Sequence, residues 1–408
     1  MNKSDKREVF NGGSMSPFWD HDHFNPYHNQ FSVELDHEID PELLAQAWNK
    51  TKEVYPLIDW VPERVGGDVV FYEDDLKNPP IHSAVSVIPG GELTAGRTFS
   101  LTYDKNRVTM NAFHSIVDGG GISSIFSTML YFYLSLYTGV RDDEPLVMTR
   151  TGRKPEEYFV PMSSVNMRDF TPVPLVSYAK RDGMFIDEEL APDDEGRIER
   201  ACLKTPVQPF MDFCKKHGAN PSSMLVYLLA KVIYDLYPDR TGDIAFVLTM
   251  SVRKFFNAPE SIANCSANLL IPVRHDDITD DEQISKAIKN IRSVISYQQS
   301  EDYIKTLTAF YDTYDWILAK RYAFVTYMGK FNVGSQTSHV RSFRMTDDAT
   351  SSLYMMDLNG EFVISFQFGR ATGKYMQGLR EVLTGYGLTA EVLTEPEIVL
   401  PDAEKPQI

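Results

Sequence analysis

A strand and a helix are predicted to meet at Phe113-His114-Ser115-Ile116-Val117-Asp118-Gly119-Gly120-Gly121. Along the preceding strand, from Arg107 to His114, alternate residues are apolar, so that His114 continues an apolar stripe. Surroundings of low dielectric constant favour the uncharged imidazole, which is the form that accepts a proton. Three successive glycines allow positive φ and the close approach of a second backbone or a ligand. The segment predicts a functional loop, and a core histidine on a tight turn is the alternative.

Patterns on both sides of this loop alternate between strand and helix. Apolar residues recur at helical spacing from Ile122 to Leu136, which predicts a helix buried on more than one side. Near the start of the chain, alternation from Phe31 to Leu35 predicts a strand, and Asp40-Pro41 marks the N-cap and first turn of a helix. Three further strands are predicted between these elements, at Val69–Tyr72, His82–Val87 and Thr98–Tyr103.

The second half of the sequence repeats this style. Asn220-Pro221 again marks the start of a helix, and the apolar run Ile244–Val252 predicts a strand that is buried on both faces and ends at Arg253. Asn359-Gly360 lies between two apolar strands and predicts an antiparallel hairpin. Helices that alternate with strands, together with one hairpin, indicate an α/β chain with mixed sheets in two halves.

Length and composition agree with a large folded protein. The chain has 408 residues, of which 43% are hydrophobic, and this excludes disorder, collagen and coiled coil. We expect an N-terminal leader over residues 1–30 and an N-terminal lobe over 31–175. A linker rich in proline and charged residues is expected over 176–200, followed by a C-terminal lobe over 201–408.

Charge and cysteine content narrow the partners. With 40 Lys and Arg against 57 Asp and Glu, the formal net charge is −17, which repels nucleic acids and anionic membranes. The polar stretch Met1–Gly13 lacks the apolar core of a secretory signal, so we expect a cytoplasmic protein. We also expect the protein to act as a monomer. Its three cysteines are too few for a disulfide framework and lack the spacing of metal ligands, and no metal is predicted.

The block H-x-x-x-D-G, from His114 to Gly119, resembles that of the CoA-dependent acyltransferase superfamily. This superfamily includes chloramphenicol acetyltransferase, the condensation domains of peptide synthetases, BAHD acyltransferases and alcohol acetyltransferases. The resemblance implies two similar chloramphenicol-acetyltransferase-like lobes, each a mixed sheet flanked by helices. It also implies that the block lies between a strand and a helix of the first lobe, as the pattern here predicts.

The same resemblance implies the chemistry. His114 would be the general base in a tunnel between the lobes, where it takes a proton from a hydroxyl or amine that attacks an acyl-CoA thioester. Such assistance is typically worth ~10² to 10⁴ in rate. Acyl-CoA would be a co-substrate, and no bound cofactor is expected. Two alternatives stay open: a condensation-type enzyme that uses a carrier-protein thioester, and a catalytically idle binding protein of the same fold.

The remaining residues of the block have implied roles of their own. Asp118, the second catalytic residue of the motif, would point away from substrate and pair with an arginine of the other half, and Gly119 would be needed for the turn. Arg253 is the candidate arginine, because a guanidinium at the end of a buried strand needs a carboxylate partner. An arginine that emerges into solvent is the alternative.

Other positions carry weaker signals. Many relatives have a second histidine where this chain has Phe113, and the D-F-G-W-G block of plant BAHD enzymes is absent. An oxyanion donor would approach from the second half, where Thr326 and Asn268 are the candidates and ordinary strand and turn roles are the alternative. Three scattered basic residues could meet a CoA phosphate or serve solubility: Lys204, Arg274 and Arg370.

Overall fold

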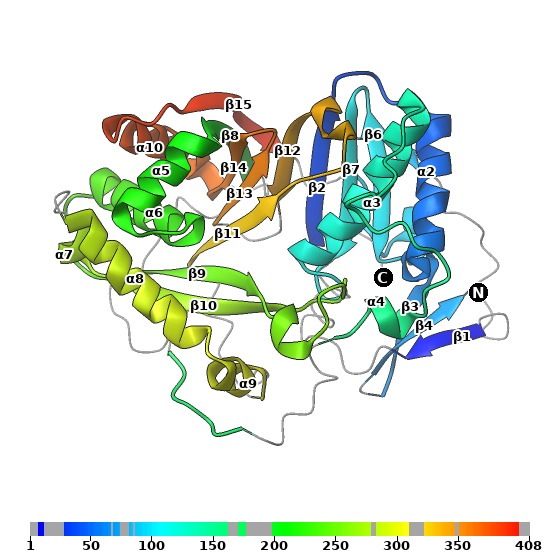
Figure 1. Ribbon diagram of the computed structural model, residues 1–408, viewed down its shortest axis with the longest axis horizontal. Helices are drawn as coiled ribbons and strands as arrows, with labels where there is room; N and C mark the ends of the chain where they lie inside the picture. The colour runs from blue at the N-terminus through cyan, green and yellow to red at the C-terminus, as the bar shows by residue number, and fades with distance from the viewer. Residues whose placement is uncertain are drawn as a thin grey trace.

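The computed structural model describes residues 7–11, 28–66, 68–73, 81–84, 86–161, 170–176, 198–278, 283–309, 322–346 and 351–399. The described residues form two mixed α/β lobes, each a sheet with helices packed on it (Figure 1). Most of the expected leader and linker, residues 1–30 and 176–200, lies outside the described residues. No helix in the described part of the chain is both long and apolar enough to cross a bilayer.

The first lobe contains a five-stranded sheet of order β12-β2-β7-β6-β5. Its strands are β2 (His28–Leu35), β5 (His82–Ser83), β6 (Phe99–Asp104), β7 (Arg107–Phe113) and β12 (Val340–Thr346). β5 is the one parallel strand and is shorter than predicted. Beyond Ser83 the chain is joined to the sheet by hydrogen bonds that involve side chains. Asn111 Nδ2, for example, donates to the carbonyl of Val87 at 3.2 Å.

Two helices, α2 (Pro41–Val54) and α3 (Gly119–Thr138), pack side by side on this sheet (Figure 1). Asp40 caps α2 as predicted, because its Oδ1 accepts from the backbone N–H groups of Glu42 and Leu43 at 2.9 and 3.1 Å. Beneath α3 the ring of Phe31 meets that of Phe126 edge-on. β7, which ends just before His114, lies between β2 and β6 in this sheet.

A smaller sheet of order β1-β4-β3 extends the first lobe, from β1 (Arg7–Asn11), β3 (Val61–Val65) and β4 (Asp68–Glu73). β1 comes from the part of the sequence expected to be a leader, and it pairs antiparallel with β4. A short helix, α4 (Pro155–Tyr158), follows α3 after a long connection.

The second lobe contains a seven-stranded sheet of order β10-β9-β11-β13-β14-β8-β15. Its strands are β8 (Ile198–Pro206), β9 (Ile244–Ser251), β10 (Ser266–Val273), β11 (Ala323–Lys330), β13 (Ser352–Leu358), β14 (Glu361–Gln367) and β15 (Glu391–Val399). The hairpin at Asn359-Gly360 is confirmed, and both residues have positive φ, as a tight antiparallel turn requires. β11 runs parallel to both of its neighbours, which makes the sheet mixed.

Most helices of the second half gather on this sheet (Figure 1). Those that contact its strands are α5 (Val207–His217), α6 (Pro221–Leu236), α8 (Ile284–Gln298) and α10 (Thr372–Gly385), whereas α7 (His275–Ile278) and α9 (Glu301–Ala309) pack on other helices of this lobe. α6 is buried along most of its length and packs against both α8 and α10. Its predicted start is present, since Asn220 Oδ1 accepts from the backbone N–H of Ser223 at 2.8 Å.

One strand passes from the second half to the first. β12 lies within the range expected for the C-terminal lobe, 201–408, but it pairs antiparallel with β2 and completes the five-stranded sheet. Phe343 of β12 faces the core, where its ring meets Phe31 at 5.2 Å. The two halves are therefore interlocked, and the sequence boundary between them does not separate the two sheets.

Candidate active site

His114 is the first residue after β7, and it is partly exposed. The chain turns there, because the N–H groups of Ile116 and Val117 both donate to the carbonyl of Phe113, at 3.1 and 3.2 Å. Phe113 itself is buried and packs against Gly90, where a side chain would collide with its ring. His114 thus lies on a tight turn and is not fully buried.

Asp118 is the N-cap of α3, and every lone-pair direction of its carboxylate is used. Oδ1 accepts from the Gly121 N–H at 2.8 Å and from Arg253 Nη2 at 2.6 Å. Oδ2 accepts from Arg253 Nη1 at 2.9 Å and from the Cys265 N–H at 3.0 Å. The expected ion pair between the two halves is therefore present, and it is bidentate and buried. Asp118 thereby joins the start of α3 to Arg253 and to the backbone of Cys265.

Arg253 is equally saturated. Besides Asp118, it donates from Nε to the Ser261 carbonyl at 2.6 Å, from Nη2 to the Ala263 carbonyl at 2.9 Å, and from Nη1 to Ser251 Oγ at 3.1 Å. These bonds use all five N–H donors of a guanidinium. Burial acts to lower the pKa of Arg253, but the Asp118 carboxylate outweighs it and leaves the pKa raised. Arg253 is a fixed internal cation, with no donor left for a substrate.

Of the two purposes predicted for the glycines of the loop, positive φ is absent and the close approach of a second backbone is present. Gly119, Gly120 and Gly121 all lack positive φ, so the turn does not need them for their backbone conformation. Gly121 is needed for space, because the atom that a side chain there would meet belongs to the backbone. A Cβ on Gly121 would lie 2.0 Å from the carbonyl oxygen of Ile262, and one on Gly119 would lie 2.9 Å from Met328 Cε. The start of α3 can therefore approach the backbone of the second half closely enough for Asp118 to reach Arg253.

Asn264 is a residue of the second half that contacts His114. Its Nδ2 donates to the backbone carbonyl of His114 at 2.8 Å and lies 3.3 Å from His114 Nδ1. Its backbone N–H donates to the Ile116 carbonyl at 3.0 Å. Its Oδ1 accepts from the N–H of Ser266 at 3.2 Å, which fixes the orientation of the amide. Asn264 thus attaches the histidine turn directly to the start of β10.

The two candidate oxyanion donors lie elsewhere on the second sheet. Asn268 is inside β10, where its Oδ1 accepts from Thr249 Oγ1 at 3.0 Å. Thr326 is buried in β11, paired with Tyr354. Among the described residues neither side chain forms a hydrogen bond with His114. The asparagine that contacts His114 is Asn264, just before β10, and the oxyanion role of Thr326 and Asn268 stays a prediction.

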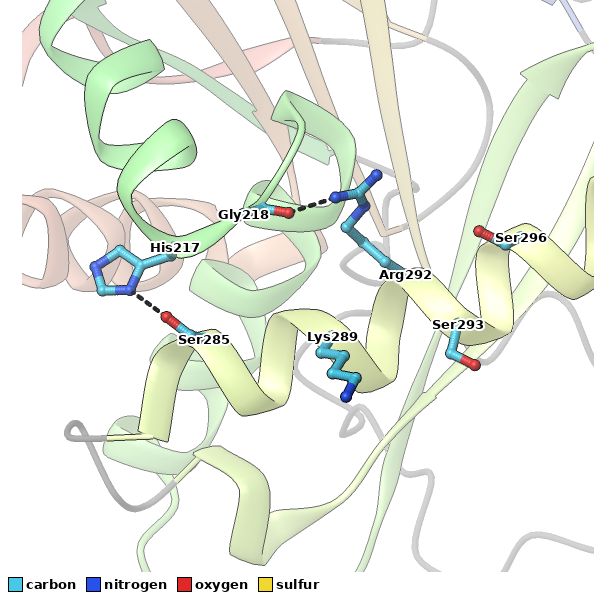
Figure 2. Close-up of a pocket in the computed structure, with 7 residues that line it drawn as sticks. All are labelled: His217, Gly218, Ser285, Lys289, Arg292, Ser293 and Ser296. Carbon is cyan, nitrogen blue, oxygen red and sulfur yellow. Dashed lines mark hydrogen bonds between the residues drawn. The ribbon is translucent and has the colours of Figure 1, made fainter.

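A separate hollow of about 460 Å³ lies on the second lobe, between the end of α5 and the helix α8 (Figure 2). Arg292 Nη1 donates to the Gly218 carbonyl at 2.6 Å, and His217 Nδ1 lies 3.1 Å from Ser285 Oγ. The lining consists of His217, Gly218, Ser285, Lys289, Arg292, Ser293 and Ser296. The lining includes no residue of the His114 loop, and it includes none of the three basic residues named as candidates for contact with a CoA phosphate. This hollow is therefore separate from the candidate active site.

Neither a protein-family model nor a curated protein sequence matches this chain. Solved structures do share its fold. TRI101 of F. graminearum, solved with coenzyme A and deoxynivalenol, is 10% identical, with a TM-score of 0.58 over 90% of this chain and 96% of that one. Trichothecene 15-O-acetyltransferase TRI3 from Fusarium sporotrichioides is 10% identical, with a TM-score of 0.60 over 93% and 95%. The first condensation domain of the CDA synthetase is 11% identical, with a TM-score of 0.59 over 91% and 96%.

These likenesses confirm the predicted fold, with two mixed α/β lobes of the acetyltransferase and condensation-domain type. They extend over nine-tenths of the chain or more, so the whole chain corresponds to that fold and not to one lobe of it.

Proposed function

We propose that this chain, which has the fold of those acetyltransferases and condensation domains, transfers an acyl group from a thioester to a hydroxyl or amine, with His114 as general base. One observation carries the proposal. His114 is partly exposed at the junction of the two lobes, on a loop that the second lobe holds through Asn264 and through the Asp118–Arg253 pair. So many contacts to the backbone of one turn are what a preorganised catalytic group requires.

The reaction balances without a further reagent. His114 takes the proton of the acceptor O–H or N–H as that atom attacks the thioester carbonyl. The tetrahedral intermediate then collapses, the C–S bond breaks, and the imidazolium returns its proton to the departing thiolate. The products are an ester or amide and a free thiol, and His114 is again neutral.

Direct transfer fits this chain better than a covalent acyl-cysteine route. Cys202, Cys214 and Cys265 are all buried. Burial raises the pKa of the Cys214 thiol to about 12, and burial together with nearby Asp118 raises that of Cys265 to about 11. Because the thiolate is the nucleophilic form of cysteine, these side chains stay unreactive near neutral pH.

We propose a CoA thioester as the donor, as suggested by the likeness to TRI101, which was solved with coenzyme A. The likeness to a condensation domain supports a second candidate, in which the thioester is carried by a protein. Both donors present the same carbonyl to His114. The acceptor is a hydroxyl or amine compound whose identity the described residues do not specify.

The test is thiol release from acetyl-CoA in the presence of a panel of alcohols, phenols and amines. We expect release well above the acceptor-free rate with at least one acceptor class, and acylated product in equal amount. Acyl-pantetheine is tested in parallel as a second donor. An enzyme that takes its acyl group from a carrier protein should use acyl-pantetheine as well as it uses acetyl-CoA. Ligand binding with no acceptor-dependent release from either donor supports the idle binding protein and overturns the proposal.

Replacing Asn264 by alanine should lower kcat by up to about 10²-fold and leave the KM of the donor nearly unchanged, because a displacement of the turn by about 1 Å costs that much. Asn264→Asp is the informative partner. It keeps the bond from Ser266 but places an acceptor oxygen against the His114 carbonyl, so we expect a loss at least as large. Steady-state kinetics across pH provide the measurement. Wild-type kcat in both variants contradicts a positioning role.

A further inference from the structure

Asp36, His37 and His339 form a cluster on the first lobe. Asp36 and His37 directly follow β2, and His339 is the last residue of the short 3-10 helix η10 (Gln336–His339), just before β12. The backbone N–H of Asp36 donates to the His339 carbonyl at 3.0 Å, which keeps the two segments together. The cluster therefore lies where the strand that passes between the halves joins the first sheet.

The ligand atoms of this cluster converge. His37 Nδ1 lies 2.7 Å from Asp36 Oδ1, and His339 Nδ1 lies 3.0 Å from Asp36 Oδ2. One ligand atom from each of the three residues lies within 4.8 Å of the other two. Their side chains are 24%, 11% and 30% exposed for Asp36, His37 and His339, so an ion and its water ligands can reach them.

The imidazole of His37 is also oriented from behind. Its ring stacks on that of Tyr137, with centroids 3.7 Å apart and planes 5° from parallel. Its Nε2 lies 3.3 Å from Tyr133 Oη, which in turn accepts from the backbone N–H of Asp40 at 3.1 Å. Histidines that bind metals typically bond a second group through the ring nitrogen remote from the metal, and this contact fixes the ring.

We propose that Asp36, His37 and His339 bind one divalent transition-metal ion, with Zn²⁺ as the preferred example, and that water completes the coordination. Two imidazole nitrogens and one carboxylate oxygen are a donor set that suits Zn²⁺, at bond lengths of ~2.0 to 2.2 Å. Ligand atoms around such an ion stand somewhat more than 3 Å apart, so small side-chain rotations from the present distances are enough. The ion would join the end of β2 to the start of β12.

One neighbouring group opposes a cation. Arg341 Nη2 lies 3.7 Å from Asp36 Oδ2. The Arg341 side chain is 65% exposed, and its pairing with Asp36 is a surface contact of little energetic value. It can turn to solvent when an ion takes its place. Without metal, the two histidines and Arg341 share the Asp36 carboxylate, which is the alternative state that the experiment must distinguish.

The experiment titrates the full chain, first stripped with a chelator, with Zn²⁺ in a calorimeter at pH 7.5, and repeats it with Co²⁺ followed by visible absorption. We expect the wild type to bind one ion. In His339→Ala and in Asp36→Asn we expect the affinity of this site to fall by at least about 100-fold, and the d–d absorption bands of bound Co²⁺ to disappear. The matched control is His275→Ala. His275 also has a neighbouring aspartate, with its Nδ1 3.3 Å from Asp276 Oδ1, but it lies outside the cluster and should leave binding unchanged.

Circular dichroism confirms that both variants are folded before they are compared. Wild-type affinity and stoichiometry in His339→Ala, or no binding by the wild type at millimolar Zn²⁺, overturns the proposal and leaves the cluster as an ion pair. The readout is metal binding, so it stands or falls separately from acyl transfer by His114.

Discussion

Replacing His114 by alanine lowers the rate of acyl transfer by about 10²- to 10⁴-fold, because the acceptor then has to lose its proton without a positioned base. The thiol-release assay measures the change as kcat, with the acceptor class that the wild type uses. His275→Ala serves as the control, since it removes an imidazole from the start of α7, outside the His114 loop. Equal release by wild type and His114→Ala would remove the general-base assignment.

The fold survives this substitution for a structural reason. Asn264 bonds the backbone carbonyl of residue 114, and alanine keeps that carbonyl. The turn is further held by the bonds to the Phe113 carbonyl and by Asp118, none of which involves the imidazole. A loss of activity in His114→Ala therefore reports on the chemistry of the ring, and an unchanged unfolding midpoint distinguishes it from a general loss of structure.

Local patterns in the sequence predicted most of the fold around the site. Periodicity placed β2, β7 and α3 close to their observed positions, and the cap at Asp40 together with Pro41 placed the start of α2. The partner of Asp118 was also predictable, since Arg253 follows a strand too apolar to leave a guanidinium unpaired.

What the sequence could not show depends on distant contacts. Asn264 lies 150 residues after His114, in a stretch without a motif, and only the docking of β10 against the loop gives its amide a role. The glycines predicted the close approach of a second backbone but not that this backbone is Ile262, and the positive φ that was also predicted is absent. The transfer of β12 to the first sheet is likewise invisible, since its alternation fits either sheet.

The second large effect is on stability. Asp118→Asn leaves the buried guanidinium of Arg253 without its carboxylate, and breaking a buried pair in this way costs about 3 to 5 kcal/mol. In the native protein each carboxylate oxygen accepts two N–H groups. In either orientation the asparagine amide therefore places its own N–H₂ group against two N–H donors. Urea unfolding, followed by circular dichroism, measures the shift of the midpoint, and acyl transfer falls with it because α3 and the His114 turn lose their common anchor.

A double-mutant cycle distinguishes the ion pair from ordinary packing. Arg253→Leu alone strips Asp118 of its counter-charge and should destabilise the protein by a similar amount, whereas the double variant leaves no unpaired charge in the interior. We therefore expect the double variant to lose clearly less free energy of unfolding than the two single losses added together. It still loses the bonds from Arg253 to the Ser261 and Ala263 carbonyls, so full recovery is not expected. Strictly additive losses would show that Asp118 and Arg253 act independently, and the connection between the lobes would then rest on Asn264 and the β12 strand.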